Sequence, residues 1–381
     1  MQRIHIQKAE FERVLALGSQ CVVPSRALPL SGYVRISVKG DKLKVEAFNE
    51  LSSIRVYGTL DMETEECSFC VDCNDLAKFV KAVSDNDITI ILEEKSMKLL
   101  HSKGECVFPI VPAKDFPESN VGAGDGVNPT FSLEGATLER WIGYAKDFVS
   151  LDELRPNISG VYMYCQGGKI GFCATNQTNL ITDEISTEEF ADLNTSLIIN
   201  YKAFASIVNV FKDADLVTIS VGDNSVMLSS SNVRMYIRKT AAVFPNFRVL
   251  FNNFGDQSVV FRRSDMAEAL KRINLCCSNA SKRIFLTFCD GSLNIRHDNL
   301  IDNKSASEDV SYVGDCTLSF CFITDNLLKA VLNTSTDEVR MCFVSESKPV
   351  FITECGENAS LAKRLLICPS VKVTNPQQKN G

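Results

Sequence analysis

The hydrophobic and polar positions along the chain repeat one pattern three times. A short apolar strand followed by an amphipathic helix is predicted at residues 3–20, 130–149 and 258–277, whose starts lie 127 and 128 residues apart. In each helix the apolar positions recur at the spacing of one helical face, so that face must be buried against another element. The repetition predicts three tandem copies of one structural unit.

The apolar face expected in each first helix can be named. It consists of Phe11, Val14, Leu15 and Gly18 in the first copy, Leu138, Trp141, Ile142, Ala145, Phe148 and Val149 in the second, and Met266, Ala269, Leu270, Ile273 and Cys277 in the third. Trp141 is the only tryptophan, and its place on this face predicts a core residue.

The rest of each copy also follows one plan. A hairpin pattern with a Gly or Asp turn is predicted at 32–49, 160–176 and 283–299. A second strand and helix follow at 68–83, 196–211 and 318–333, with apolar triads Leu76, Phe79 and Val80, then Phe204, Ile207 and Val208, then Leu328, Val331 and Leu332. More strand pattern closes each copy. Two helices and about eight strands per copy predict an α+β fold with helices on antiparallel sheets.

Domain boundaries are expected at the glycine-rich stretch 121–129 and near 251–257. The predicted domains are 1–122, 128–253 and 257–371, and the polar tail 372–381 is expected to be disordered. A chain of 381 residues is too long for a single hydrophobic core, which agrees with this division.

Composition and charge narrow the class of protein. With 45% hydrophobic and 23% charged residues, no long apolar run and no signal peptide at the start, the chain is expected to be cytoplasmic. Its fifteen cysteines are then expected to be reduced thiols that pack as small apolar residues. The net charge of -7 argues against coating nucleic acid by bulk attraction, but it allows a local basic surface.

Lysine and arginine recur on the predicted helices away from their apolar faces. The candidate positions are Lys78, Lys81, Arg140, Lys146, Lys202, Lys212, Lys271, Arg272 and Lys329. Many of the helix acids lie instead near first turns, where they complement the helix macrodipole. A basic helix face is usually only a solvated one, but its repetition in three copies favours contact with the phosphates of double-stranded DNA. Such contacts carry no sequence information.

No catalytic residue, metal or cofactor is expected. The run Cys67, Cys70 and Cys73 has the start of a metal-site spacing but no second pair of ligands. The three histidines stand beside no nucleophile motif, and no Walker or dinucleotide motif is present. Two other readings stay open at this point: a cysteine-dependent enzyme, and a three-domain scaffold that never touches DNA.

Five short motifs resemble, in order and spacing, the bacterial sliding clamp family (DNA polymerase III beta subunit). They are ALPLSG at 27–32, VPAKDFP at 111–117, RPNISGV at 155–161, FPNFR at 244–248 and LLICP at 365–369. The resemblance implies a processivity factor without enzymatic activity. It also implies a head-to-tail homodimer whose six domains close a ring around duplex DNA, with twelve helices lining the hole.

The resemblance further implies one peptide pocket per protomer, between the second and third domains, for the replicative polymerase, the clamp loader and repair proteins. Carried over by position, the pocket comprises Arg155, Thr175, Leu180, Pro245, Leu250, Pro349, Leu366, Cys368 and Pro369. The chain departs from the family at 174–180, which reads ATNQTNL where ATDxxRL is usual, and at Cys368, where methionine is common. A pocket of altered polarity is therefore expected.

Overall fold

The computed structural model describes residues 2–117, 128–278, 282–299, 303–357, 359–360 and 362–370, hereafter the described residues. The chain divides into two compact units. Unit 1 contains Met1–Ile142 and Leu193–Ala241, and unit 2 contains Gly143–Asp192 and Ala242–Gly381. The boundaries of the three domains drawn from the sequence stay predictions. The tail at 372–381 and most of the glycine-rich stretch lie outside the described residues.

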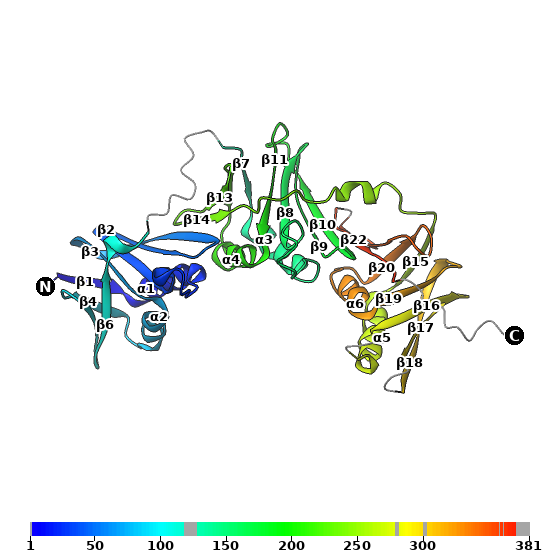
Figure 1. Cartoon of the computed structure of the whole chain (residues 1–381), viewed down its shortest axis with the longest axis horizontal. Helices are drawn as coiled ribbons and strands as arrows, with labels where there is room; N and C mark the ends of the chain where they lie inside the picture. Colours follow the sequence, from blue (N-terminus) through cyan, green and yellow to red (C-terminus); the bar gives the residue numbers. More distant parts are fainter. Residues whose placement is uncertain are drawn as a thin grey trace. The chain divides into compact units, whose positions relative to one another are not determined.

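The three predicted strand–helix starts are present (Figure 1). They are β1 (Gln2–Gln7) with α1 (Lys8–Gly18), β7 (Thr130–Leu133) with α3 (Gly135–Ala145), and β15 (Gln257–Arg262) with α5 (Arg263–Cys276). One backbone contact recurs in all three copies, because the first helical N–H donates to a carbonyl that follows the second helix of the same copy. The pairs are Lys8 to Asn86 at 2.7 Å, Gly135 to Ala214 at 3.0 Å and Arg263 to Asp337 at 2.8 Å. This shared contact shows that the repetition extends to the backbone.

The second strand and helix of each copy are also present. These elements are β3 (Ser52–Asp72) with α2 (Cys73–Ala82), β11 (Asn194–Asn200) with α4 (Tyr201–Phe211), and β19 (Ser319–Ile323) with α6 (Thr324–Leu332). Side-chain caps start two of the helices: Asp72 accepts from the Asp75 N–H at 3.0 Å, and Asn200 accepts from the Lys202 N–H at 2.9 Å. The prediction of two helices per copy is confirmed.

Unit 1 contains one antiparallel sheet with the strand order β1-β4-β5-β6-β3-β14-β13-β12-β7, in which β2 also pairs with β3. The strands not yet located are β2 (Tyr33–Phe48), β4 (Asp87–Leu92), β5 (Ser96–His101), β6 (Gly104–Pro112), β12 (Val217–Val221), β13 (Ser225–Ser229) and β14 (Val233–Arg238). Short 3₁₀ turns are η1 (Ser19–Cys21), η2 (Pro29–Gly32) and η3 (Ala113–Asp115). Helix α1 packs on α2 and on strands β2 and β3.

Unit 2 contains an antiparallel run in the order β8-β9-β10-β22-β21-β20-β15-β18-β17-β16-β19. Its other strands are β8 (Gly160–Gln166), β9 (Lys169–Thr175), β10 (Asn179–Ser186), β16 (Arg283–Cys289), β17 (Ser292–Asn299), β18 (Lys304–Asp315), β20 (Glu338–Phe343), β21 (Val350–Glu354) and β22 (Arg364–Ile367). Helix α5 packs on α6 and on β17 and β18, while α6 also contacts β19 and β22. The pairing of β10 with β22 joins the second copy of the repeat to the third, and it positions the candidate site described below.

Most residues of the helix faces predicted from periodicity lie in the core, but four are only partly buried: Phe79, Ile142, Cys277 and Leu328. Phe11, Trp141 and Leu270 are fully buried, with 0% of each residue exposed. Burying a large apolar side chain contributes about 1.5–3 kcal/mol. In α6 the prediction was wrong for Leu332, which is 40% exposed. The buried residues there are Leu327, Ala330 and Val331, so the packed face lies beside the one predicted. No helix among the described residues is long and apolar enough to cross a membrane.

Candidate functional site

Three of the predicted pocket residues lie in one row across the sheet of unit 2. Thr175 ends β9, and Leu180 on β10 is paired with it. Leu180 is also paired with Leu366 on β22. Residues directly opposite each other in an antiparallel pair project from the same face. The three side chains therefore form a continuous row, and all are buried.

The row continues at the ends of β21 and β22. Leu366 is paired with Phe351 on β21. Pro349 stands two residues before Phe351, and Cys368 two residues after Leu366, so strand alternation predicts that both belong to the same face. The Cys368 N–H donates to the Thr178 carbonyl at 2.7 Å, which holds the chain against the β9–β10 turn. Cys368 and Pro369 are half-buried, and burial raises the pKa of the Cys368 thiol.

The segment 242–254, which we call the connector, lies on this same face. Phe244 stacks on Tyr162 of β8 with ring centroids 4.8 Å apart, and Phe254 contacts Phe351 at 4.6 Å. Between these contacts runs the 3₁₀ turn η4 (Phe247–Phe251). The aromatic contacts hold the predicted pocket residues Pro245 and Leu250 over the sheet. Leu250 is 42% exposed and is therefore accessible from solvent.

A glycine allows the end of the connector to meet the sheet. Gly255 has a φ of 79°, and a Cβ built there would lie 1.8 Å from the Phe343 carbonyl oxygen. Any other residue would clash with backbone and adopt a disfavoured conformation. Gly255, in the predicted boundary motif at 251–257, therefore allows the backbone of the connector's end to approach the backbone of β20 closely.

Arg155 reaches the rim of the row through the β9–β10 turn. Its guanidinium donates to the Gln177 side chain and forms an ion pair with Asp152 at 3.3 Å. The turn is stabilised by Asn176, whose side-chain oxygen accepts from the N–H groups of Thr178 at 3.1 Å and Asn179 at 2.9 Å. Asn176, which stands where the family pattern has aspartate, thus forms the turn with its side chain.

Asn179, which stands where the family pattern has arginine, is less well accommodated. It is 1% exposed, and neither polar atom of its side chain has a hydrogen-bond partner among the described residues. It neighbours Leu180 along the strand, so its side chain projects from the sheet face opposite the row. This departure from the family pattern therefore lies on the face opposite the row.

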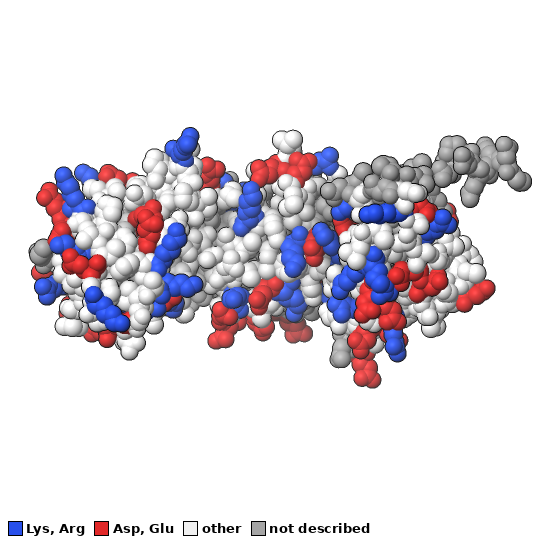
Figure 2. Space-filling view, turned by 90° about the horizontal axis from the view of Figure 1, so that it is seen from below, with Lys and Arg blue, Asp and Glu red and all other residues white. Residues whose placement is uncertain are grey.

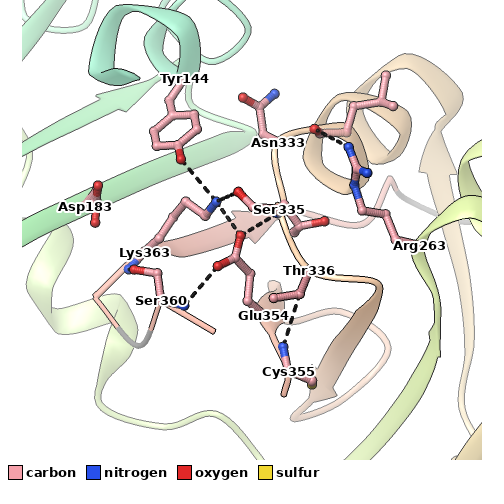
Figure 3. Close-up of polar contacts among 12 residues, drawn as sticks. Tyr144, Asp183, Arg263, Asn333, Ser335, Thr336, Glu354, Cys355, Ser360 and Lys363 are labelled. Carbon is pink, nitrogen blue, oxygen red and sulfur yellow. Dashed lines mark hydrogen bonds and ion pairs between the residues drawn. The ribbon is translucent and has the colours of Figure 1, made fainter. Parts of the chain in front are cut away.

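A buried charged cluster fixes the strand that carries Leu366. Figure 3 shows Tyr144, Ser335, Glu354 and Lys363 pointing toward one another. The Lys363 ammonium forms an ion pair with Glu354 and donates to the hydroxyls of Ser335 at 3.0 Å and Tyr144 at 3.2 Å. The side chains of Lys363 and Glu354 are each 2% exposed. The cluster connects the residues just before β22 to the end of β21 and to the end of α3.

The Glu354 carboxylate is well compensated. It also accepts from the backbone N–H of Ser335 at 2.6 Å and of Ser360 at 3.0 Å. Burial alone would raise the pKa of Glu354, but the hydrogen bonds from Lys363 and from these amides outweigh it and hold the pKa below its ordinary value. This cluster could not be predicted from the sequence, because a lysine in a polar stretch before a strand gives no sign of burial.

The predicted DNA-facing cations all lie on or beside helices. Lys78, Lys81, Arg140, Lys146, Lys202, Lys212, Lys271 and Arg272 are exposed, and Lys329 is partly exposed. Figure 2 shows Lys and Arg side chains interspersed with Asp and Glu on the face seen there. The face seen in Figure 2 is therefore of mixed charge.

Two of these cations are engaged with acids. Arg272 donates to both carboxylate oxygens of Glu308 at 2.9 Å and holds the pKa of that carboxyl below its ordinary value. Lys329 lies 3.8 Å from Asp147. By contrast, five lysines have side chains without an ion pair or hydrogen bond within the part of the chain that the structure describes: Lys78, Lys81, Lys146, Lys212 and Lys271. These five are the better candidates for phosphate contact.

The alternative chemistry of the cysteines finds little support in their surroundings. All fifteen cysteines are free. Burial raises the pKa of Cys70 to about 11 and of Cys73 to about 12, which disfavours the thiolate that binds metals and attacks substrates. His297 is buried, with its Nδ1 atom 2.7 Å from the Arg283 carbonyl. These side chains take part in packing and backbone contacts.

Family models for the central and C-terminal domains of the DNA polymerase III beta subunit match residues 132–246 and 248–366. The beta sliding clamp of Rickettsia bellii is 23% identical over 310 residues, which cover 75% of this chain and 79% of that protein. The beta sliding clamp of Rickettsia felis is 21% identical over 380 residues, which cover 92% of this chain and 96% of that protein.

Solved structures show the same fold. A DnaN sliding clamp from Pseudomonas aeruginosa bound to griselimycin superposes with a TM-score of 0.90 at 20% identity, covering 97% of this chain and 100% of its own. The DNA polymerase III beta subunit of Thermotoga maritima gives a TM-score of 0.88 at 19% identity, covering 98% and 100%. The α+β clamp fold expected from the sequence is confirmed. Because the two family models together span more than half of the chain, we conclude that the chain belongs to the DNA polymerase III beta subunit family, the bacterial sliding clamps.

Proposed function

We propose that the protein is a cytoplasmic processivity factor for DNA polymerase that performs no catalysis. In this proposal it encircles duplex DNA, slides without sequence specificity and tethers other replication proteins. The observation that supports it most is family membership together with the row Thr175–Leu180–Leu366, which is built across two copies of the repeat.

The proposed ring is a head-to-tail homodimer. Sheets with open edges invite pairing with another chain, and a two-fold arrangement satisfies such edges in a closed assembly. Among the described residues, β1 pairs only with β4, and β19 only with β16. Edges of this kind, at both ends of a threefold repeat, favour closure with a second copy. A scaffold that never meets DNA would have no need of a closed ring.

The proposed partner site is the row together with Pro245, Leu250, Pro349, Cys368 and Pro369, with Arg155 at its rim. Apolar side chains from β10, β22 and the connector surround it, so it suits an extended peptide that ends in Leu or Phe. Binding energy in such a site is concentrated in a few buried anchors. The proposed occupants are short motifs of the replicative polymerase, the clamp loader and repair proteins.

The proposed DNA contact is made by helix lysines to phosphates, so it is expected to be weak and sensitive to salt. We expect Lys78→Glu, Lys212→Glu and Lys271→Glu together to reduce the loaded fraction on circular DNA by about tenfold or more. Each copy loses one unpaired cation in this variant. The measurement is gel filtration of protein loaded by a clamp loader on nicked circular DNA.

A matched variant carries the same charge change elsewhere. Lys42→Glu, Lys103→Glu and Lys348→Glu alter exposed lysines outside the six helices. Surface changes of this kind usually cost under about 0.5 kcal/mol each, so both variants should stay folded. Equal loss of loading in the two variants would show that net charge matters and the helix positions do not. Unchanged loading in the helix variant would overturn the assignment of these lysines.

A further inference from the structure

The sheet face that carries the row also contains a cavity of about 480 Å³. Its lining includes Tyr164, Lys169, Glu184, Phe251, Arg248 and Arg364, all from unit 2. None of the nine predicted pocket residues lines it. The cavity is thus a second hollow on the face proposed for partner binding.

The cavity and the row are neighbours along two strands. Thr182 on β10 is paired with Arg364 on β22, and this pair lies two residues from the pair Leu180 and Leu366. Two residues along a strand span roughly 6–7 Å. The connector contributes to both places, because Pro245 and Leu250 belong to the proposed partner site beside the row while Phe247, Arg248 and Phe251 line the cavity. A chain that occupies the row can therefore continue into the cavity within a few residues.

The charges in the cavity are unbalanced. Lys169 forms an ion pair with Glu184, and the Tyr164 hydroxyl donates to the same carboxylate at 3.1 Å. Arg248 and Arg364 have no carboxylate partner among the described residues. The charged lining is three cations against one carboxylate, on a chain whose net charge is -7. Such a concave site concentrates anions.

Both unpaired guanidiniums are positioned by aromatic rings. The Arg248 guanidinium carbon lies 4.5 Å from the centroid of the Tyr164 ring and 5.2 Å from that of Phe247. The Arg364 guanidinium carbon lies 5.6 Å from the Phe251 ring centroid. A guanidinium held over an aromatic ring by cation–π attraction keeps N–H groups that can donate to another ligand. Two oriented donors of this type suit carboxylates, which arginine binds through paired hydrogen bonds.

We propose that this cavity binds the side-chain carboxylates of an acidic segment that flanks the pocket-binding motif in a partner protein. The proposal rests on the proposed function of the row as a partner site. Leu180 and Glu184 are four residues apart on β10, a span of about 13 Å. An extended linker of about four or five residues covers that distance. The partner would then hold the clamp at two linked points, which raises affinity beyond that of the motif alone.

The test compares labelled peptides by fluorescence anisotropy. All contain a Gln-x-x-Leu-Phe type motif. One is the motif alone, and two carry an Asp-Glu-Asp-Glu segment after a spacer of about five residues, at the N-terminal or the C-terminal side. Two more carry Asn-Gln-Asn-Gln in the same places. We expect one acidic peptide to bind about tenfold more tightly than its neutral counterpart, with a gain that decreases as salt is added.

Substitution of the two arginines isolates the cavity. In Arg248→Gln/Arg364→Gln the gain in affinity of the acidic peptide over its neutral counterpart is expected to fall below about twofold. The affinity for the motif alone is expected to be unchanged. The matched variant Arg283→Gln/Arg340→Gln removes two exposed arginines outside the cavity and should keep the gain. Thermal unfolding of both variants checks that they fold. The absence of a gain at either end, or a full gain in Arg248→Gln/Arg364→Gln, overturns the proposal.

A last experiment distinguishes whether the proposal for the cavity or the proposal for the row is wrong. The acidic segment without the motif is titrated at millimolar concentration and followed by NMR chemical shifts. Arginine-dependent shifts are expected even if the motif alone does not bind, in which case only the partner function of the row would fail. If the acidic segment binds the wild type and Arg248→Gln/Arg364→Gln equally, or neither, the cavity proposal is wrong whatever the motif does.

Discussion

Replacement of Lys363 by methionine is expected to lower the free energy of unfolding by about 3–5 kcal/mol at neutral pH. Removing one partner of a buried ion pair leaves the other charge uncompensated in the interior. In this variant the group left without its ion-pair partner is the Glu354 carboxylate, whose side chain is 2% exposed. Urea unfolding followed by circular dichroism measures the loss. Lys348→Met, at an exposed position, is the matched control and should change the free energy by less than about 0.5 kcal/mol.

The pH dependence follows from the lowered pKa of Glu354. In the wild type this carboxylate contributes stability above its ordinary pKa of 4.5, and the contribution is lost as the pH falls through the lower folded-state value. The loss of unfolding free energy in Lys363→Met, relative to the wild type, should be smaller at acidic pH, because the unpaired Glu354 carboxylate can then be protonated. The double variant Lys363→Met/Glu354→Gln should recover much of the loss. A deficit below about 1 kcal/mol in Lys363→Met would contradict the role assigned to the cluster.

Replacement of Leu366 by aspartate is expected to remove binding of a Gln-x-x-Leu-Phe type peptide, at a cost of at least about 2 kcal/mol in binding free energy, or roughly thirtyfold in affinity. The charge would lie in the row between Leu180 and Phe351, where a Leu or Phe anchor is proposed to pack. Fluorescence anisotropy measures the affinity, and sedimentation shows whether assembly is retained.

Leu366 is 3% exposed, so this change also lowers stability. Leu250→Asp provides the second test, because Leu250 is 42% exposed and tolerates a charge in the folded state. Leu250→Asp should weaken peptide binding by about as much as Leu366→Asp does. Leu275→Asp, at an 83% exposed site on α5, is the control for added charge. If folded Leu250→Asp and Leu366→Asp both bind with wild-type affinity, the peptide site is elsewhere.

The helices and their threefold repetition could be predicted from the sequence. Burial of one helical face requires apolar residues at a regular spacing, and this spacing is visible in the amino-acid sequence. Trp141 and Phe11 show this, since each lies in the expected stripe and is fully buried. In α6 two adjacent leucines made the face ambiguous. Leu327 is buried while Leu328 is only partly so, and nothing local distinguishes them.

The site was less accessible to prediction from periodicity. The row depends on the register of β10 with β22, strands that lie almost 190 residues apart in sequence. The resemblance supplied those positions, and strand patterns alone could not. Lys363 and Arg364 show the limit clearly. These neighbours at the start of β22 have different surroundings, since Lys363 takes part in a buried ion pair and Arg364 lines the cavity. Both read as ordinary surface cations in the sequence.

The central claim, that the protein acts as a closed ring around DNA, is tested most directly by topology. Wild-type protein is loaded by a clamp loader on nicked circular duplex DNA, isolated by gel filtration and then treated with a restriction enzyme that cuts the circle once. We expect the protein to stay on the uncut circle through a wash at high salt and to be released when the circle is cut, because phosphate contacts alone are weak at that ionic strength. Retention on the linear product, or equally fast loss from the uncut circle, would contradict the ring.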